Sequence, residues 1–171
     1  MKKILCFVFL SGLFAINVNA QDTQKKASPL VKVSEKIASG ATVTIEYSQP
    51  SVKGRTIGKD LEPLEGKIWR TGANDATTFT TDKDVTIDGQ TLPAGKYALF
   101  TLFEGDNVTV IFNKTWKQWG AFNYKQDEDA LRIKTKATEA ATASEKLNIT
   151  LDANGMVNLL WGNKSVSFTV K

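Results

Sequence analysis

The stretch KYALFTLFEGDNVTVIFN, residues 96–113, contains two apolar runs on either side of a polar turn. The runs 96–103 and 107–113 are dense in Leu, Phe, Val and Ile. Strands that are covered on both faces have this continuous apolar character, whereas strands with one wet face alternate. Gly105 and its polar neighbours supply turn residues between the runs. We therefore expect two central strands of a sheet here.

The sequence on both sides of this pair predicts half-buried strands. In residues 41–48, Val43, Ile45 and Tyr47 alternate with polar side chains, which is the period of a strand with one buried face. Similar alternation recurs in residues 84–89, 131–136, 147–152 and 166–170. Turn signals separate these pieces at Asp88-Gly89, Pro93-Ala94-Gly95, Asn154-Gly155 and Gly162-Asn163, of which Asn154-Gly155 is the strongest hairpin signal.

Many short strands without a convincing long helix predict an all-β fold. We expect an antiparallel β-sandwich, of jelly-roll or Ig-like arrangement, with a partly open barrel as the alternative. Two irregular segments, 49–66 and 113–130, interrupt the strand pattern. Connections this long are usually functional loops or disordered ones. Residues 136–145 predict a short helix or a loose connection.

The amino-terminal residues predict export. Lys2 and Lys3 precede an apolar run that closes on a small-residue cleavage pattern at about Ala20, as in a secretory signal peptide. We expect residues 1–20 to be that signal peptide, 21–28 to be a disordered linker and 29–171 to be a single β-sandwich domain. No later stretch is long and apolar enough for a transmembrane segment. The predicted location is secreted or periplasmic, in a bacterial envelope.

Composition narrows the classes of protein and partner. Cleavage of the signal removes Cys6, the single cysteine, and a secreted chain without disulfides fits a bacterial envelope. It leaves 151 residues with 20 Lys and Arg against 18 Asp and Glu, a net charge of +2, which gives no indication of nucleic-acid binding. The basic stripe Arg132, Lys134 and Lys136 is interpreted as one solvated strand face.

The missing residue types restrict the chemistry. The sequence has no His and, after processing, no Cys, which excludes Ser-His-Asp and Cys-His nucleophilic catalysis within the chain. The usual zinc ligands are absent as well, and we predict no cofactor and no metal. Asp82, Asp84 and Asp88 are interpreted as solvated strand-end charges rather than calcium ligands. A carboxylate pair such as Glu46 and Asp75 keeps a hydrolase open, but catalysis is not the favoured interpretation.

The block KIWRTGANDATTF, residues 67–79, carries the first candidate site. Arg70 could bind a ligand carboxylate, phosphate or sugar hydroxyl, with Asn74 and Asp75 as further polar candidates. The structural alternative has Trp69 in the core, Gly72 in a turn with positive φ and Arg70 paired with Asp75. We favour the core for Trp69 and leave both interpretations open for the others.

The second candidate site lies in residues 113–124, where Trp116 and Trp119 could form a stacking platform for a glycan or another flat ligand. Lys114 and Gln118 are its polar candidates. Core closure by the two indoles is the favoured alternative, because large aromatic side chains supply much of the burial in a sheet protein. Arg55, in the long loop, is a further candidate that we expect to be exposed unless the loop folds over both blocks.

Three ordered blocks resemble a known family. WRTGAND (69–75), TLPAGKYALFT (91–101) and FNKTWKQWGAFNY (112–124) are similar to the signature blocks of DUF2911, a bacterial family of secreted proteins common in Bacteroidetes. The similarity extends from about Gln49 to the carboxyl end. Family members usually carry Glu where this chain has Asp75, and often an aromatic residue where it has Leu64. The resemblance implies an envelope location and a single domain, and no established activity.

We therefore expect a non-catalytic envelope protein that binds a small molecule, glycan or peptide, in a pocket made by the 49–66 loop and the two candidate blocks. The alternative is a structural or interaction module whose exposed aromatic residues dock an envelope protein partner. A carboxylate-dependent hydrolase is the third hypothesis.

Overall fold

The computed structural model describes residues 27–171, so the predicted signal peptide and residues 21–26 of the predicted linker lie outside the described residues. In this range the regular structure is strand, apart from one 3₁₀ turn at Gln126–Glu128. No helix in the described range is long and apolar enough to cross a membrane. The strands are β1 (Leu30–Lys36), β2 (Thr42–Ser48), β3 (Ile68–Trp69), β4 (Ala73–Thr81), β5 (Val85–Ile87), β6 (Gln90–Leu92), β7 (Gly95–Glu104), β8 (Asn107–Asn113), β9 (Asp129–Leu151) and β10 (Met156–Thr169).

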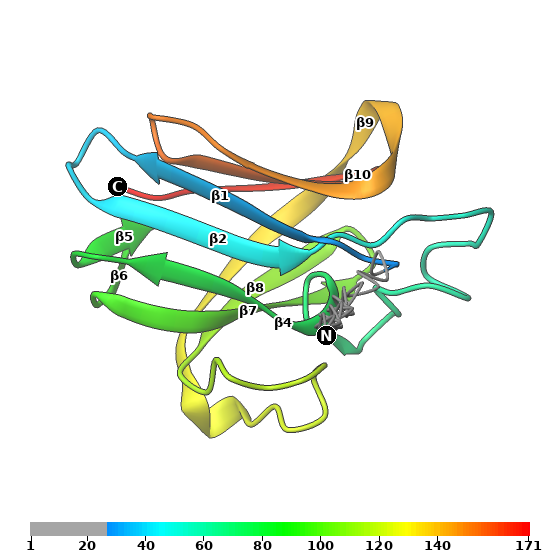
Figure 1. Ribbon diagram of the computed structural model, residues 1–171, viewed down its shortest axis with the longest axis horizontal. Helices are drawn as coiled ribbons and strands as arrows, with labels where there is room; N and C mark the ends of the chain where they lie inside the picture. Colours follow the sequence, from blue (N-terminus) through cyan, green and yellow to red (C-terminus); the bar gives the residue numbers. More distant parts are fainter. Residues whose placement is uncertain (1–26) are drawn as a thin grey trace, which may run out of the picture.

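The strands form one curled antiparallel sheet and a small hairpin. The sheet order is β1-β2-β4-β7-β8-β9-β10, with β3 also paired to β7, and β5 pairs with β6. The prediction of an all-β antiparallel fold is confirmed. The main sheet curls as a half-barrel around the core (Figure 1), so its shape is close to the partly open barrel that the sequence analysis kept as its alternative.

The pair β7 and β8 lies at the centre of the sheet, as its apolar runs predict. One face of each strand points into the main core, where Leu99, Val110 and Phe112 are fully buried. The opposite face carries a second, smaller core, in which Phe100 and Ile111 pack beneath residues from the segment that follows β8. Both faces are covered, which explains why these strands do not alternate.

Strand β9 is 23 residues long and includes residues 136–145, for which the prediction of a helix or loose connection is wrong. Its first part pairs with β8, and its later part, through residue 151, pairs with β10. The sequence KATEAATASE has only a weak local preference for strand, because Ala and Glu are poor strand formers. Pairing with β10, the other arm of the Asn154-Gly155 hairpin, decides the conformation instead.

The ribbon made by β9 and β10 folds back on itself. A straight strand of 14 residues would span about 46 Å, yet the amide of Val170 donates to the carbonyl of Gly155, at the other end of β10, at 2.8 Å. The reversal lies near Gly162, where φ is 59° and the register of the β9–β10 pairing shifts. Gly162-Asn163 is therefore an irregularity within β10, and its prediction as a turn between strands is wrong. The C-terminal residue then reaches β5, where Thr86 and Lys171 exchange backbone hydrogen bonds at 2.7 and 2.9 Å.

The segment after β8 covers the outer face of the sheet and is anchored by a polar network around Asp129. The Asn113 amide and the Tyr124 hydroxyl donate to this carboxylate at 2.8 and 2.7 Å, and the Arg132 guanidinium contacts it at 2.7 Å. Tyr124 also packs edge-on against Phe100, with 5.3 Å between ring centroids. Burial, together with the hydrogen bond to Asp129, raises the pKa of Tyr124 to about 12.

The three aspartates that follow β4 hold neighbouring backbone in place. The carboxylates of Asp82, Asp84 and Asp88 accept hydrogen bonds from the amides of Thr42, Ala94 and Thr169, at 2.7, 2.7 and 2.9 Å respectively. The hydrogen bond from Thr42 lowers the pKa of Asp82. Each carboxylate has its own structural partner, so the three do not act as one group.

Two hairpin glycines provide a matched test of the folded ribbon. Gly155 and Gly89 have φ of 82° and 84°, but an added Cβ would lie 1.9 Å from the Val170 carbonyl oxygen at Gly155 and would meet nothing within 4 Å at Gly89. We expect Gly89→Ala to lower the free energy of unfolding by about 1–2 kcal/mol through backbone strain alone. Gly155→Ala should cost about 2–5 kcal/mol, because the clash adds about 1–3 kcal/mol. Urea denaturation measures both; equal losses would contradict the fold-back contact.

A second test uses Tyr124. Its pKa in the folded protein, about 12, lies above the ordinary value near 10. The neutral phenol therefore contributes stability that is complete below pH of about 10 and is lost as the pH rises toward about 12. We expect Tyr124→Phe to be less stable than the parent at pH 8, with the gap narrowing by pH 11. Urea unfolding across this range measures it, and the difference between the two proteins cancels the titration of lysines. If the difference in unfolding free energy between the two proteins stays constant from pH 8 to pH 11, the raised pKa of Tyr124 is contradicted.

Candidate functional site

The candidate site is built around a break at the edge of β7. Strand β4 pairs with residues 95–98 of β7, and β3 pairs with 101 and 102, so both strands occupy the same edge. The chain between them, Arg70 to Gly72, leaves the sheet and returns. The first signature block therefore contains an interruption between two strands that pair with the same side of β7, beside the long loop that precedes it.

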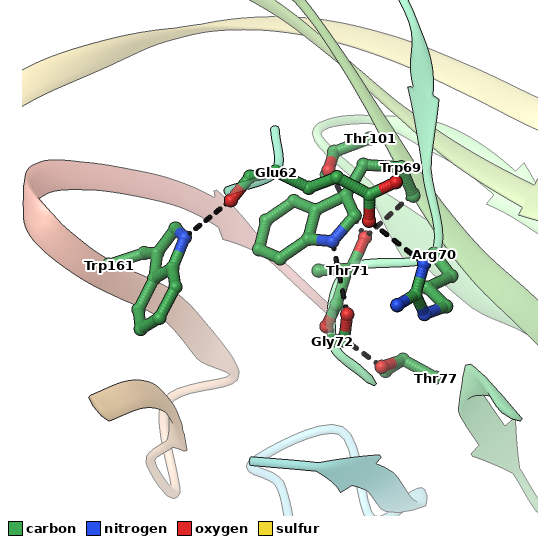
Figure 2. Close-up of polar contacts among 8 residues, drawn as sticks. All are labelled: Glu62, Trp69, Arg70, Thr71, Gly72, Thr77, Thr101 and Trp161. Carbon is green, nitrogen blue, oxygen red and sulfur yellow. Dashed lines mark hydrogen bonds and ion pairs between the residues drawn. The ribbon is translucent and has the colours of Figure 1, made fainter. Parts of the chain in front are cut away.

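Buried polar groups fix this interruption (Figure 2). The hydroxyls of Thr71 and Thr101 lie 3.1 Å apart, and the Thr77 hydroxyl donates to the Thr71 carbonyl at 2.8 Å. All three threonines are fully buried. The indole N–H of Trp69 donates to the carbonyl of Gly72 at 3.1 Å. These contacts satisfy the three threonine hydroxyls and the Trp69 indole internally, and they fix the backbone of the break.

The glycine of this block is required for space rather than for a positive φ. Thr71 and Asn74 adopt the left-handed conformation, with φ of 54° and 57°, and Gly72 does not. A Cβ on Gly72 would lie 2.9 Å from the Thr77 hydroxyl and 3.0 Å from the Ser48 carbonyl oxygen. The expected positive-φ turn at Gly72 is therefore wrong. The predicted burial of Trp69 in the core is confirmed, with 2% of the residue exposed.

Arg70 pairs with Glu62 of the long loop. Its Nη1 lies 2.8 Å from the Glu62 Oε2, and the alternative pairing with Asp75 is wrong. That pairing fails because the left-handed residue Asn74 turns the chain before Asp75, which is exposed. The Nε–H of Arg70 is buried and has no hydrogen-bond partner among residues 27–171. A buried donor without a partner is unusual in a folded protein.

Two cavities lie under the long loop, and the ion pair lines one of them. One, of about 220 Å³, is lined by Arg55, Glu62 and Arg70 together with the indoles of Trp69 and Trp161. The other, of about 210 Å³, has both indoles in its wall as well. The wall of this second cavity also contains apolar residues from the loop, from β7 and from β10, namely Ile57, Phe103, Leu159 and Val166. The cavities are neighbours that share two tryptophans.

The long loop is held over these cavities by the folded ribbon. The indole N–H of Trp161 donates to the Glu62 carbonyl at 2.8 Å (Figure 2). Gly162 makes room for Ile57, because a Cβ there would lie 2.6 Å from the Ile57 Cδ1. At the start of the loop, the Val52 amide donates to the Glu145 carbonyl at 2.8 Å. The loop thus has fixed contacts at both ends.

Most charges around the cavities are already paired. Lys164 contacts Asp106 and Glu139 at 3.0 and 2.8 Å. The Glu65 carboxylate accepts the Gly105 amide at 2.7 Å. The guanidinium of Arg55, which is exposed, donates to the backbone carbonyls of Ser51 and Val52. Asp60 also lines the cavity with Arg70 and makes no ion pair among the described residues. The groups of this wall that keep hydrogen-bonding capacity are therefore the exposed Asp60 carboxylate and the buried Nε–H of Arg70.

The other candidates lie apart from these cavities. Asn74, Asp75 and Trp119 line a separate open cavity with Ala27 and Ser28. Lys114 is exposed. Gln118 is buried, where its Nε2 donates to the Thr115 carbonyl. The structure thus divides the predicted pocket in two, with Arg70 and Arg55 at one place and the aromatic block at another.

The interpretation of Trp116 and Trp119 as core-closing residues is wrong. They are 39% and 62% exposed. The outer core that this segment covers is small, and Tyr124 fills it instead by packing on Phe100. The main core on the other face of the sheet is closed by the ribbon, whose Trp161 is buried.

Sequence reasoning missed Glu62, Phe103 and Trp161 as parts of the site. Trp161 lies in an apolar stretch of β10 that carries no site motif. The one available signal was the adjacent Gly162-Asn163, which breaks the strand pattern at the point where the ribbon bends. Among residues 27–171, no group of His, Cys, Asp or Glu side chains could hold a metal ion.

Comparisons with known proteins identify a family and no individual relative. No curated protein and no solved structure matches the chain significantly. The sequence model described as "protein of unknown function (DUF2911)" matches residues 28–170. This match includes β1 and β2 as well as the three signature blocks. The chain belongs to DUF2911, a family of proteins of unknown function.

Proposed function

We propose that the chain is exported to the bacterial envelope and there binds a small organic molecule, with an apolar body and one carboxylate or carbonyl group, in the paired cavities under the long loop. The observation that carries this proposal is the buried, unpartnered Nε–H of Arg70, in a residue that lines a cavity walled by two indoles. The domain acts by binding rather than by catalysis.

The Arg70 side chain supplies the polar end of this proposed site. A buried donor without a partner costs about 1–3 kcal/mol. A ligand oxygen beside Nε would remove this cost and gain a charge-assisted hydrogen bond. Glu62 already contacts Nη1 and holds one side of the guanidinium. The Nε–H is covered by protein atoms, so the proposal includes a small rotation of the Arg70 side chain that brings Nε to the ligand oxygen. A carboxylate or carbonyl oxygen is the group that fits.

The apolar walls supply the rest of the binding energy. Both indole N–H groups donate to backbone carbonyls, those of Gly72 and Glu62, so the indoles offer the ligand mainly carbon. The cavities, of about 220 and 210 Å³, are smaller than the 300–1,000 Å³ or so typical of drug-sized ligands. A single aromatic ring or a short alkyl chain with one acidic group is the expected size.

The ligand class can be tested with defined probes. We expect benzoate, phenylacetate, indole-3-acetate or hexanoate to raise the melting temperature more than benzyl alcohol, indole or hexanol. At a ligand concentration of about 100 times Kd, stabilisation is about 2.7 kcal/mol, or roughly 5–10 °C for a domain of this size. Differential scanning fluorimetry finds the best probe, and calorimetry measures its Kd.

Variants of the cavity wall locate the binding. Arg70→Gln should weaken the best probe about tenfold or more, because a hydrogen bond to a charged group contributes about 1.5–3 kcal/mol. Lys67→Gln is the control, since it removes the same charge from an exposed residue that lines neither cavity and should change Kd less than twofold. Leu159→Phe should fill the apolar cavity and abolish binding. Equal effects of Arg70→Gln and Lys67→Gln, or no stabilisation by any acid, would rule out the proposed site.

Export is tested separately. When the complete chain is expressed in a Gram-negative host, we expect periplasmic protein that begins at Gln21, because the cleavage pattern ends at Ala20. Intact-mass spectrometry of the periplasmic and cytoplasmic fractions measures this. Protein that retains residues 1–20 in the cytoplasm would contradict export while leaving the cavity proposal to its own test.

A further inference from the structure

An exposed aromatic cluster lies on the segment that covers the outer face of the sheet. Trp116, Trp119 and Phe122 are 39%, 62% and 80% exposed, and they are three of the five large hydrophobic side chains exposed within residues 27–171. In Figure 1 this segment, yellow-green, lies at the bottom of the view, away from the ribbon. Exposed aromatic residues gathered in this way indicate a binding surface.

The cluster has a defined geometry. The rings of Trp119 and Phe122 stack with 5.5 Å between centroids and 15° between planes. Gly120, between them, has φ of 66°, and a Cβ there would lie 2.8 Å from two carbons of the Phe122 ring. The stack therefore requires glycine at this position. Phe122 covers one face of the Trp119 indole, and the high exposure of Trp119 leaves its opposite face accessible.

Backbone contacts fix this stack beside the start of β4. Trp119 and Asp75 form a β-bridge, the Ala76 amide donates to the Gln118 carbonyl at 2.9 Å, and the Gly120 amide donates to the Asn74 carbonyl at 3.0 Å. The indole and the two polar residues of the first signature block are thereby held together. A ligand would meet them without a large rearrangement.

Aromatic and polar groups line one open cavity here, of about 410 Å³, to which Asn74, Asp75 and Trp119 contribute. This volume lies within the range of about 300–1,000 Å³ typical of small-molecule sites. Asp75 is exposed and makes no ion pair with any described residue. The Asn74 amide lies 3.5 Å from the Ser28 carbonyl, a contact at the limit of a hydrogen bond. Both polar side chains therefore have hydrogen-bonding capacity to offer.

We propose that this surface binds a glycan, with one pyranose ring stacked on the free face of Trp119 and its hydroxyls hydrogen-bonded to Asp75 and Asn74. The C–H groups on one face of a pyranose pack well on a flat aromatic ring. A carboxylate accepts hydrogen bonds, and a carboxamide both donates and accepts, which suits adjacent hydroxyl groups.

The ring arrangement favours a sugar over a cation. Aromatic sites for quaternary ammonium groups surround the charge with several ring faces. Here the two rings are nearly parallel, so they present a flat surface and not a cage. The third aromatic ring, Trp116, already has the Lys96 ammonium 4.4 Å from its centroid. The free face of Trp119 is thus the part of the cluster suited to a neutral, flat partner.

The cavity beside Trp119 borders the Arg70 cavity, because Ser28 lines both. The proposed glycan contacts Trp119, Asn74 and Asp75 line neither cavity under the long loop. The two proposals can therefore fail independently.

The test titrates isotope-labelled protein, residues 21–171, with hexasaccharides of β-1,4-linked glucose, xylose, mannose and N-acetylglucosamine. We expect at least one of them to shift the NMR resonances of the Trp119 indole N–H and of the Asn74 and Asp75 amides. Trp119→Ala should raise Kd at least tenfold. Met156→Ala is the control, because it removes an exposed large hydrophobic side chain outside this cluster and should change Kd less than twofold.

Circular dichroism and melting temperature provide the folding control, and both should stay close to those of the parent protein because Trp119 is exposed. Several results would overturn the proposal. They are the absence of shifts with all four saccharides at 10 mM, equal binding by Trp119→Ala and the parent, and shifts confined to the surroundings of Trp161. Self-association that depends on Trp119, without saccharide binding, would identify the surface as a contact between copies and would also overturn it.

Discussion

The reversal of the β9–β10 ribbon at Gly162 is the constraint on which the rest of the structure depends. The bend needs a residue with φ of 59° and no Cβ, because a Cβ there would lie 2.6 Å from Ile57 of the long loop. Folding back brings Leu147, Ile149 and Leu159 into the main core, all buried there. A half-barrel alone leaves one side of its apolar face in water. The ribbon covers that side, so one glycine allows both core closure and placement of the loop.

The contacts that close the core also shape the cavities. Trp161, beside the bend, donates its indole N–H to the Glu62 carbonyl, while the Glu62 carboxylate holds Arg70. Glu62 of the loop therefore connects the ribbon, through Trp161, to the first signature block, through Arg70. Moving the loop would disturb the guanidinium, and moving the ribbon would disturb the loop. This linkage explains how an irregular segment of the chain can form a defined cavity wall without regular secondary structure.

Much of the fold could be predicted from sequence because local patterns specify it. The continuous apolar character of β7 and β8 reflects burial on two faces, and Asn154-Gly155 specifies a hairpin by turn geometry alone. The strand at residues 136–145 could not be predicted, because pairing with the other arm of a long hairpin overrides a weak local preference for strand. In the candidate site, Arg70 and its loop were identifiable, but its partner Glu62 was not. The exposure of Trp116 and Trp119 depends on which side chain fills the outer core. No local pattern in the sequence indicates that Tyr124, and not one of the two tryptophans, is buried there.

The first signature block serves two surfaces, and its backbone explains how. Thr71 and Asn74 both have positive φ, so the chain changes direction on each side of Gly72. The first change follows Arg70, which lines a cavity under the loop, and the second precedes Asp75, which lines the cavity beside Trp119. An extended strand would place these side chains by simple alternation along one sheet edge. Two left-handed residues are energetically unfavourable, and buried threonine hydrogen bonds offset that cost. A block this dense in polar and aromatic residues is therefore understandable as a wall of two neighbouring cavities, each of which carries one of the proposed sites.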